Sequence, residues 1–301
     1  MTLARRPSRP SAGWVGAVTV AHWLLLGALA PASPPPPAPA AWQARWVTAS
    51  APAADMRRNV APTRSAPLFA SPSSPPSGPP SAPDPDSGDP VHLPPAQRLR
   101  LAQTGSWAGR AVGGEAELAW RLDGDRYEAQ WSHPSPTGRR TLRSEGRAGP
   151  GGLAPQRFGD RHRGESAAHF EPEAGRIRFS GNQPDAAWQP GAQDRVSVLL
   201  QLAGLAAAAP GRFTPGRQVT VRVAGTRDAA DWTFRVLAPE ELPLQGLHPW
   251  TVRLQRAASG PHDLQVDVWL APALGYIPVR IRLTWGAGDW LEQQWVPPDT
   301  R

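Results

Sequence analysis

The clearest pattern along the chain is an alternation of apolar and polar residues in its C-terminal two thirds. Residues 217–223 read RQVTVRV, with three valines on one face and polar residues on the other. The same alternation recurs over residues 232–236, 264–270 and 277–285. Because successive side chains of a strand point to opposite faces, these segments predict an antiparallel sheet that is covered on one face.

Glycine-containing turns separate these strands from others. Two of them, Asp123-Gly124-Asp125 and Gly286-Ala287-Gly288, are placed to join neighbouring strands of hairpins. Around them we expect further strands over residues 116–122, 127–132 and 290–296. More turns are expected at residues 134–138, 149–152 and 173–175. Three histidines close to proline or glycine are also expected in turns: His133, His248 and His262.

One segment, residues 192–211, lacks the alternation and is rich in leucine and alanine. Asp194 can cap the start of a helix here, and Pro210-Gly211 can end it. The leucines give this helix a wide apolar stripe. The fold class that follows is mainly β: a curved antiparallel sheet or half-barrel packed around one central helix.

The first thirty residues run from basic to apolar. Three arginines precede residues 13–30, which carry no formal charge and as a helix rise about 27 Å at about 1.5 Å per residue. A bilayer core is roughly 30 Å thick, and basic residues favour the cytoplasmic side. We therefore predict a single-pass inner-membrane protein, anchored through residues 13–30, with its C-terminal domain in the periplasm.

A cleaved signal peptide is the alternative, because Ala28-Leu29-Ala30 has the small residues of a cleavage site. Pro31 follows directly, and its fixed φ and missing N–H disfavour a protease that holds the chain extended. We favour the uncleaved anchor, whereas cleavage leaves a soluble periplasmic protein.

Residues 31–96 consist mostly of proline, alanine and serine, and we expect a disordered linker with polyproline II character. The predicted domains are an anchor over 1–30, this linker, and a β-rich periplasmic domain over 97–301. The first two resemble the corresponding parts of TonB-like proteins, which place a polar residue and a histidine in one membrane span. Thr19 and His22 are those residues here, at a spacing that differs from the one expected in that family.

Composition narrows the function classes. The chain has no cysteine, which excludes disulfides and thiolate metal sites. The net charge of +7 divides into +3 for residues 1–96 and +4 for residues 97–301, too even a balance for a nucleic-acid binder. The densest basic cluster predicts a solvated strand edge and comprises Arg139, Arg140, Arg143 and Arg147.

Five pieces of sequence, in this order, carry a family resemblance. They are Gly113-Gly114-Glu115-Ala116, SEGRAGPGGLAPQRF from Ser144, Gln193-Asp194, EELPLQG from Glu240, and WLAPALGYIPVRIRL from Trp269. Together they resemble the bacterial domain of unknown function family numbered 3108 over residues 97–301. The resemblance implies an exported β-rich domain of Gram-negative envelopes, and it supplies no catalytic residues.

Few polar residues suggest chemistry. Asp194 is explained by capping, and of the neighbours Glu240 and Glu241 only Glu240 is expected to face inward, because they lie on opposite strand faces. The one cluster with metal-ligand residue types comprises Asp160, His162, Glu165, His169 and Glu171. Its spacing matches no standard pattern, and no nucleophile elbow or phosphate loop is present. We assign no catalytic residue, no metal site and no cofactor.

Tryptophan is unusually frequent, with 14 residues. If exposed on a curved sheet, Trp120, Trp131 and Trp269 form a platform for sugars or acyl chains; the favoured alternative is that both faces of the sheet are covered. With Glu240 and Asp194, these tryptophans are our candidate ligand-binding residues.

We therefore expect a non-enzymatic periplasmic β-domain, tethered to the inner membrane, that binds an apolar ligand such as a lipid, an envelope polymer or a partner protein, and no nucleic acid. Two alternatives remain. One is a hydrolase acting on envelope material through inward-facing carboxylate or histidine residues, and the other is a structural adaptor in a trans-envelope complex.

Overall fold

A computed structural model describes residues 90–286 and 288–298, and the backbone of residues 45–48. The anchor predicted over residues 13–30, with Thr19, His22 and the proposed cleavage junction, lies outside the described residues, as does most of the linker. Within the described ranges, no helix combines the length and apolarity needed to cross a membrane.

Eighteen strands of the described chain form one sheet. The strands of the first half are β1 (Arg45–Thr48), β2 (Gln97–Trp107), β3 (Arg110–Ala111), β4 (Gly114–Asp123), β5 (Arg126–Ser135), β6 (Gly138–Gly149), β7 (Gly152–Arg161), β8 (Glu165–Glu171), β9 (Arg176–Phe179) and β10 (Ala186–Ala187). Those of the second half are β11 (Gln193–Asp194), β12 (Arg217–Ala224), β13 (Ala229–Val236), β14 (Glu240–Glu241), β15 (Trp250–Arg256), β16 (Leu264–Ala271), β17 (Ile277–Trp285) and β18 (Trp290–Trp295). The strands expected from the alternation are confirmed, and turns lie at residues 124–125, 136–137, 150–151 and 172–175.

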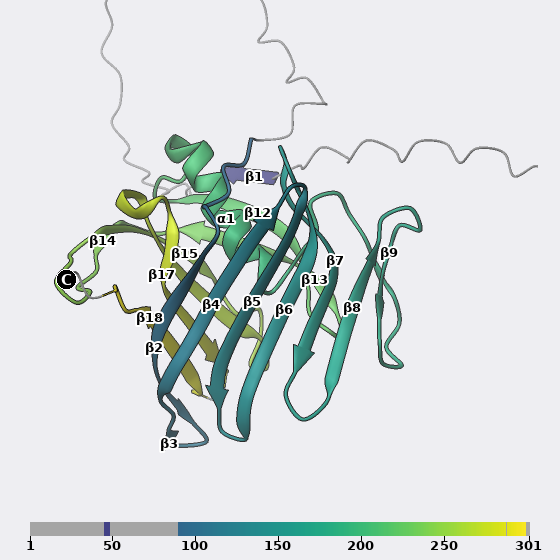
Figure 1. Cartoon of the computed structure of the whole chain (residues 1–301), viewed down its shortest axis with the longest axis horizontal. Coiled ribbons are helices and arrows are strands. Elements are labelled where there is room, and N and C mark those ends of the chain that lie inside the picture. Colours follow the sequence, from purple (N-terminus) through teal and green to yellow (C-terminus); the bar gives the residue numbers. More distant parts are fainter. Residues whose placement is uncertain (1–44, 49–89, 287, 299–301) are drawn as a thin grey trace, which may run out of the picture. The chain divides into compact units, whose positions relative to one another are not determined.

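The sheet consists of two antiparallel meanders joined through their ends. β2 to β10 form the first meander and β12 to β18 the second, with β11 pairing parallel to β12. β18 pairs with β2, so that Gln293 lies opposite Gln103. In Figure 1 the first meander lies in front and the second behind it, and the sheet is open and curved.

The helix α1 (Ser197–Ala208) lies within the segment for which a helix is expected, and two 3-10 turns, η1 (Pro210–Arg212) and η2 (Pro272–Leu274), follow. Ten of the twelve residues of α1, Ser197 to Ala206, are buried. The helix packs against β7, β11 and β17, which belong to both meanders. Most residues of α1 are apolar and need cover, which the contacts with these strands and with the segment at Val91 provide.

The folded domain begins earlier than residue 97. Val91 is buried and its N–H donates to the carbonyl of Pro150, while the N–H of His92 donates to the carbonyl of Gly204 in α1. The backbone of β1 pairs with β12. The linker boundary drawn at residue 96 is therefore wrong at its C-terminal end, because proline-rich composition does not reveal a short segment held by backbone hydrogen bonds.

Two local predictions are also wrong. His133 is not in a turn but buried in β5, where the strand continues through Pro134 to Ser135. The arginine cluster does not lie on a sheet edge, because β6 pairs with β5 on one side and β7 on the other. Arg140 shares the register of the buried residues Leu142 and Ser144, whereas the other three arginines point to the opposite, exposed face.

Candidate functional site

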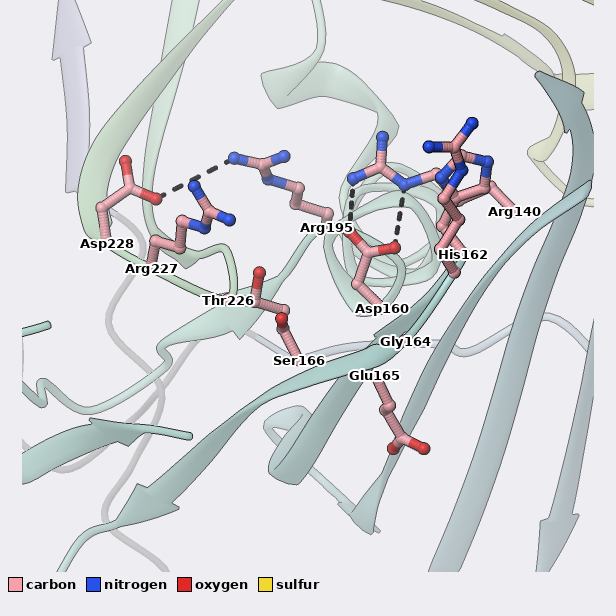
Figure 2. A pocket seen from close by; sticks show the side chains of 11 residues that line it. Arg140, Asp160, His162, Gly164, Glu165, Ser166, Arg195, Thr226, Arg227 and Asp228 are labelled. Carbon is pink, nitrogen blue, oxygen red and sulfur yellow. Dashed lines mark hydrogen bonds and ion pairs between the residues drawn. The ribbon is translucent and has the colours of Figure 1, made fainter. Parts of the chain in front are cut away.

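A cleft of about 530 Å³ opens at one end of the curved sheet. Three segments meet there: the turn between β7 and β8, the turn between β12 and β13, and the two-residue turn between β11 and α1, which carries Arg195. The residues that line it, all but Arg163 labelled in Figure 2, are Arg140, Asp160, His162, Arg163, Gly164, Glu165, Ser166, Arg195, Thr226, Arg227 and Asp228. The lining is polar and predominantly basic, with four arginines against three carboxylates.

Arg140 and Asp160 form a tight ion pair on one wall of the cleft. Arg140 donates from Nε to Oδ1 of Asp160 over 2.8 Å and from Nη2 to Oδ2. This two-point hydrogen bond raises the pKa of the Arg140 guanidinium above its usual value. Both carboxylate oxygens of Asp160 are engaged, so Asp160 neutralises Arg140 and fixes its orientation.

Arg195 lies opposite with its hydrogen-bonding capacity largely unused. Its Nη2 is 3.9 Å from Oδ1 of Asp228, beyond hydrogen-bond distance. Its Nε is buried and has no hydrogen-bond partner among the described residues. Burial lowers the pKa of Arg195 from its usual value, although the guanidinium remains charged at physiological pH. An unsatisfied buried donor costs free energy, which a bound acceptor removes.

The remaining cations of the cleft are not neutralised. In the part of the chain that the structure describes, the side chains of Arg163 and Arg227 form no ion pair and no hydrogen bond. His162 is held at Nε2 by the hydroxyl groups of Ser135 and Thr137, at 3.1 and 3.0 Å.

The carboxylate of Glu165 does not compensate them, because it pairs with Arg157, which does not line the cleft. The hydrogen bond from Arg157 lowers the pKa of Glu165, so that this carboxyl is ionised and occupied. The cleft therefore presents a net positive field to any solute that enters it.

The cleft brings together part of the predicted metal-type cluster. Asp160, His162 and Glu165 all line it, whereas His169 and Glu171 lie further along β8 and do not. No group of three or more histidine, aspartate or glutamate side chains within the described ranges is arranged to hold a metal ion. The carboxylates here instead bind arginines.

Asp194 lies away from the cleft in a closed polar network. Its Oδ1 accepts the N–H groups of Val196 and Ser197 at the start of α1, at 2.8 and 2.9 Å. Its Oδ2 accepts from the hydroxyl of Ser144, which is itself 2.7 Å from the Tyr127 hydroxyl. Burial raises the pKa of Asp194 to about 6. The predicted contact with the helix start is present, and the carboxylate has no exposed surface.

Glu240 and Trp269 are brought into contact, far from Asp194 along the sheet. Trp269 donates from Nε1 to Oε1 of Glu240. Its ring lies under the guanidinium groups of Arg253 and Arg280, 4.8 and 4.7 Å from the ring centroid. Trp269 is only 3% exposed, because Glu240, Arg253 and Arg280 cover it on its face of the sheet.

Trp120 and Trp131 are buried as well, so none of the three candidate tryptophans forms an exposed platform in this structure. Trp120 donates to the carbonyl of Pro94, and Trp131 donates to Gln293 inside the sheet. Next to Trp120 lies a second, apolar cavity of only about 10 Å³. A space of that size holds at most one water molecule, so it is too small for an acyl chain or a sugar.

The residues that dominate the cleft were not among the sequence candidates: Arg140, Arg195, Arg227 and Asp228. The sequence does distinguish Arg140 from the other three arginines of β6. Arg140 lies an even number of residues from Leu142 and Ser144, and therefore on their face of the strand. Arg195 and the 226–228 turn carry no local pattern, because they become neighbours only when β11 pairs with β12.

Comparison with known proteins gives one family and a distant structural match. The model of the family described as "Protein of unknown function (DUF3108)" matches residues 104–291. A match among solved structures is the crystal structure of a beta-barrel-like protein of domain of unknown function DUF1849 from Brucella abortus. It is 13% identical, covers 68% of this chain and 97% of that chain, and has a TM-score of 0.43. No curated protein matches the sequence.

Proposed function

The chain belongs to the DUF3108 family, which is described only as proteins of unknown function, and from the geometry of the cleft we propose that it is a non-enzymatic domain that binds an anionic ligand. The observation that carries the proposal is that two uncompensated cations, Arg163 and Arg227, line the same open cleft of about 530 Å³ as Arg195. Of the occupants expected from the sequence, an anionic envelope polymer or an anionic group of a partner protein fits this lining.

An apolar ligand fits less well. The second cavity is the apolar one and holds only about 10 Å³, and the side chains of α1 and both meanders form one continuous core. The interior is therefore filled by the chain itself, as expected of a close-packed domain.

An enzymatic role is also not favoured. A hydrolase needs two of its acid, base or nucleophilic groups at one site. Asp194, Glu240 and His162 lie in three separate environments, and Asp160 and Glu165 are occupied by arginines. A structural adaptor remains compatible with the cleft, provided that the partner contributes an anionic group.

We further propose that the domain works in the periplasm, tethered to the inner membrane through residues 13–30. The support is the sequence alone: the basic start, the uncharged block and Pro31. The intact mass of the mature protein tests this. A chain starting at Met1 or Thr2 supports the anchor, and a chain starting after residue 30 contradicts it.

Binding of dextran sulfate to the full chain, compared with uncharged dextran, tests the cleft. We expect salt-sensitive binding of the sulfated polymer alone, and its loss when Arg195 and Arg227 are both changed to glutamate. The matched control changes Arg235 to glutamate, because Arg235 is exposed near the other end of β13. Equal binding by the double variant and the control contradicts an anion site in the cleft.

A further inference from the structure

We propose that the anionic group bound in the cleft is a phosphate monoester, and that Arg195 is the residue that binds its oxygens directly. This inference rests on the proposed function, because it names the ligand chemistry of the same cleft. Its basis is a difference between two arginines of the cleft. The guanidinium of Arg140 is hydrogen-bonded to Asp160, whereas Nε of Arg195 has no partner among the described residues.

Arg140 shows what a satisfied guanidinium looks like in this cleft. Its Nε and Nη2 together donate to the two oxygens of Asp160. That edge of the guanidinium matches two oxygens of a carboxylate or a phosphate. Because Asp160 already occupies this edge, Arg140 has its main binding capacity used within the protein.

Arg195 has the same edge, but here the edge has no hydrogen-bond partner in the part of the chain that the structure describes. Nε has no partner among the described residues, and Nη2 is 3.9 Å from Asp228, too far for a hydrogen bond. The Asp228 side chain is 71% exposed, so water screens its attraction for Arg195. A ligand with two oxygens satisfies both nitrogens once the guanidinium turns to bring the buried Nε to the cleft, and the exposed Asp228 holds it too weakly to prevent this.

The surroundings of Arg195 favour a group with more than one negative charge. Arg163 and Arg227 line the same cleft without an ion pair within the described chain. A carboxylate has two oxygens and one charge, which a single arginine satisfies. A phosphate monoester has three terminal oxygens and nearly two charges at neutral pH, which suits a cleft with more than one uncompensated arginine.

Gly225 leaves room for the side chain of Arg195. A Cβ placed on Gly225 would lie 2.8 Å from Nη2 of Arg195 and 3.0 Å from Oδ1 of Asp228. The N–H of Gly225 donates to the carbonyl of Asp228 over 2.9 Å, which closes the turn. The absence of a side chain at residue 225 therefore leaves the space in which the guanidinium lies.

Calorimetric titration of the full chain with glycerol phosphate and inorganic phosphate tests the proposal, with acetate and sulfate as comparison anions. We expect both phosphates to bind more tightly than acetate. Arg195→Gln is expected to weaken phosphate binding at least about tenfold, as loss of a charge-assisted hydrogen bond does. Arg195→Lys keeps the charge but not the two-nitrogen edge. Its affinity for phosphate is expected to lie between those of the unsubstituted chain and Arg195→Gln. Asp228→Asn is expected to strengthen binding.

Arg235→Gln is the matched control, because it removes one positive charge outside the cleft and is expected to leave the affinity unchanged. A second arm uses vesicles of phosphatidylcholine with and without phosphatidic acid. Preference for the phosphatidic acid vesicles without binding of glycerol phosphate identifies a lipid headgroup as the source, and the converse identifies a soluble phosphate ester.

The failures are distinguishable. Binding of phosphate that is unchanged by Arg195→Gln but lost in Arg227→Gln overturns the role of Arg195 and leaves the anion site intact. Equal affinity for acetate and phosphate overturns the phosphate assignment. Absence of binding to any anion, dextran sulfate included, overturns the proposed function and this inference together.

Discussion

Trp131 of β5 donates from Nε1 to Oε1 of Gln293 in β18 over 2.7 Å, which joins two strands that are 162 residues apart. Gln293 in turn donates from Nε2 to Oε1 of Gln103 in β2 over 2.8 Å. Gln103 completes the series by donating to the carbonyl of Pro134. All three side chains are buried, so this series of hydrogen bonds fixes the junction of the two meanders from the inside.

Replacing Gln293 by leucine is therefore expected to lower the free energy of unfolding by about 2–6 kcal/mol. The substitution leaves the indole N–H of Trp131 and the side-chain Oε1 of Gln103 without a partner, and each unsatisfied group costs about 1–3 kcal/mol. Chemical denaturation of the full chain measures the loss. Gln130→Leu is the control, because Gln130 lies on the opposite face of β5, partly exposed. A loss no larger than that of the control contradicts a structural role for the series.

Gly204 of α1 has no room for a side chain, not even the methyl group of alanine. A Cβ at this residue would lie 2.5 Å from Cγ1 of Val91, in the segment that crosses the helix. Overpacking costs about 1–3 kcal/mol, and alanine regains up to about 1 kcal/mol through its helix propensity. Gly204→Ala is thus expected to destabilise the domain.

Two variants sharpen this measurement by denaturation. Gly211→Ala is the control, since a Cβ there meets nothing within 4 Å. Val91→Ala in the Gly204→Ala background removes the colliding methyl groups, so the two changes together are expected to cost less than the sum of the single ones. Additive effects contradict a direct contact between the two residues.

Asp194 is expected to make stability depend on pH. Burial raises the pKa of Asp194 in the folded state to about 6 from the usual 3.8, so ionisation is costly in the folded chain only. The stability that this carboxyl contributes is complete below about pH 4 and is lost as the pH rises through about 6, a change on the order of 3 kcal/mol.

Comparison with Asp194→Asn isolates this effect, because asparagine keeps an oxygen for the N–H groups of Val196 and Ser197 without titrating. The unfolding free energy of the variant, relative to the unsubstituted chain, is expected to rise between pH 4 and pH 6. Asp263 gives the opposite sign: although burial opposes it, hydrogen bonds from Arg256 and Ser259 hold the pKa of Asp263 below its usual range. A flat difference for Asp194→Asn rules out a titrating carboxyl at this position.

Gly225→Ala is expected to weaken anion binding several-fold, because the new Cβ displaces the guanidinium of Arg195. Gly164→Ala is its control within the same cleft, since nothing lies within 4 Å of a Cβ at Gly164. Titration with glycerol phosphate compares the two variants. Equal affinities show that the place of Arg195 does not depend on the space over Gly225.

The elements of this fold could be predicted where a local period exists. The valines of β12 and the turn at Gly124 placed their strands correctly, and the run of leucines placed α1. The start of the domain could not be predicted, because Val91 and His92 are held by backbone bonds to residues about sixty and more than a hundred positions away. The cleft was missed for the same reason: Arg140, Arg195 and Asp228 share no period and meet only through the pairing of β6, β7, β11 and β12.

The pairing of β18 with β2 has a consequence for how the chain reaches its native form. β18 follows every other described strand in the sequence and pairs with β2, so the two meanders cannot be joined until β18 has been synthesised. Until β18 docks, the edges of β2 and β17 that it covers stay open to pairing with other chains. Aggregation through strand pairing is therefore expected from chains in which β18 has not yet docked, rather than from the folded domain.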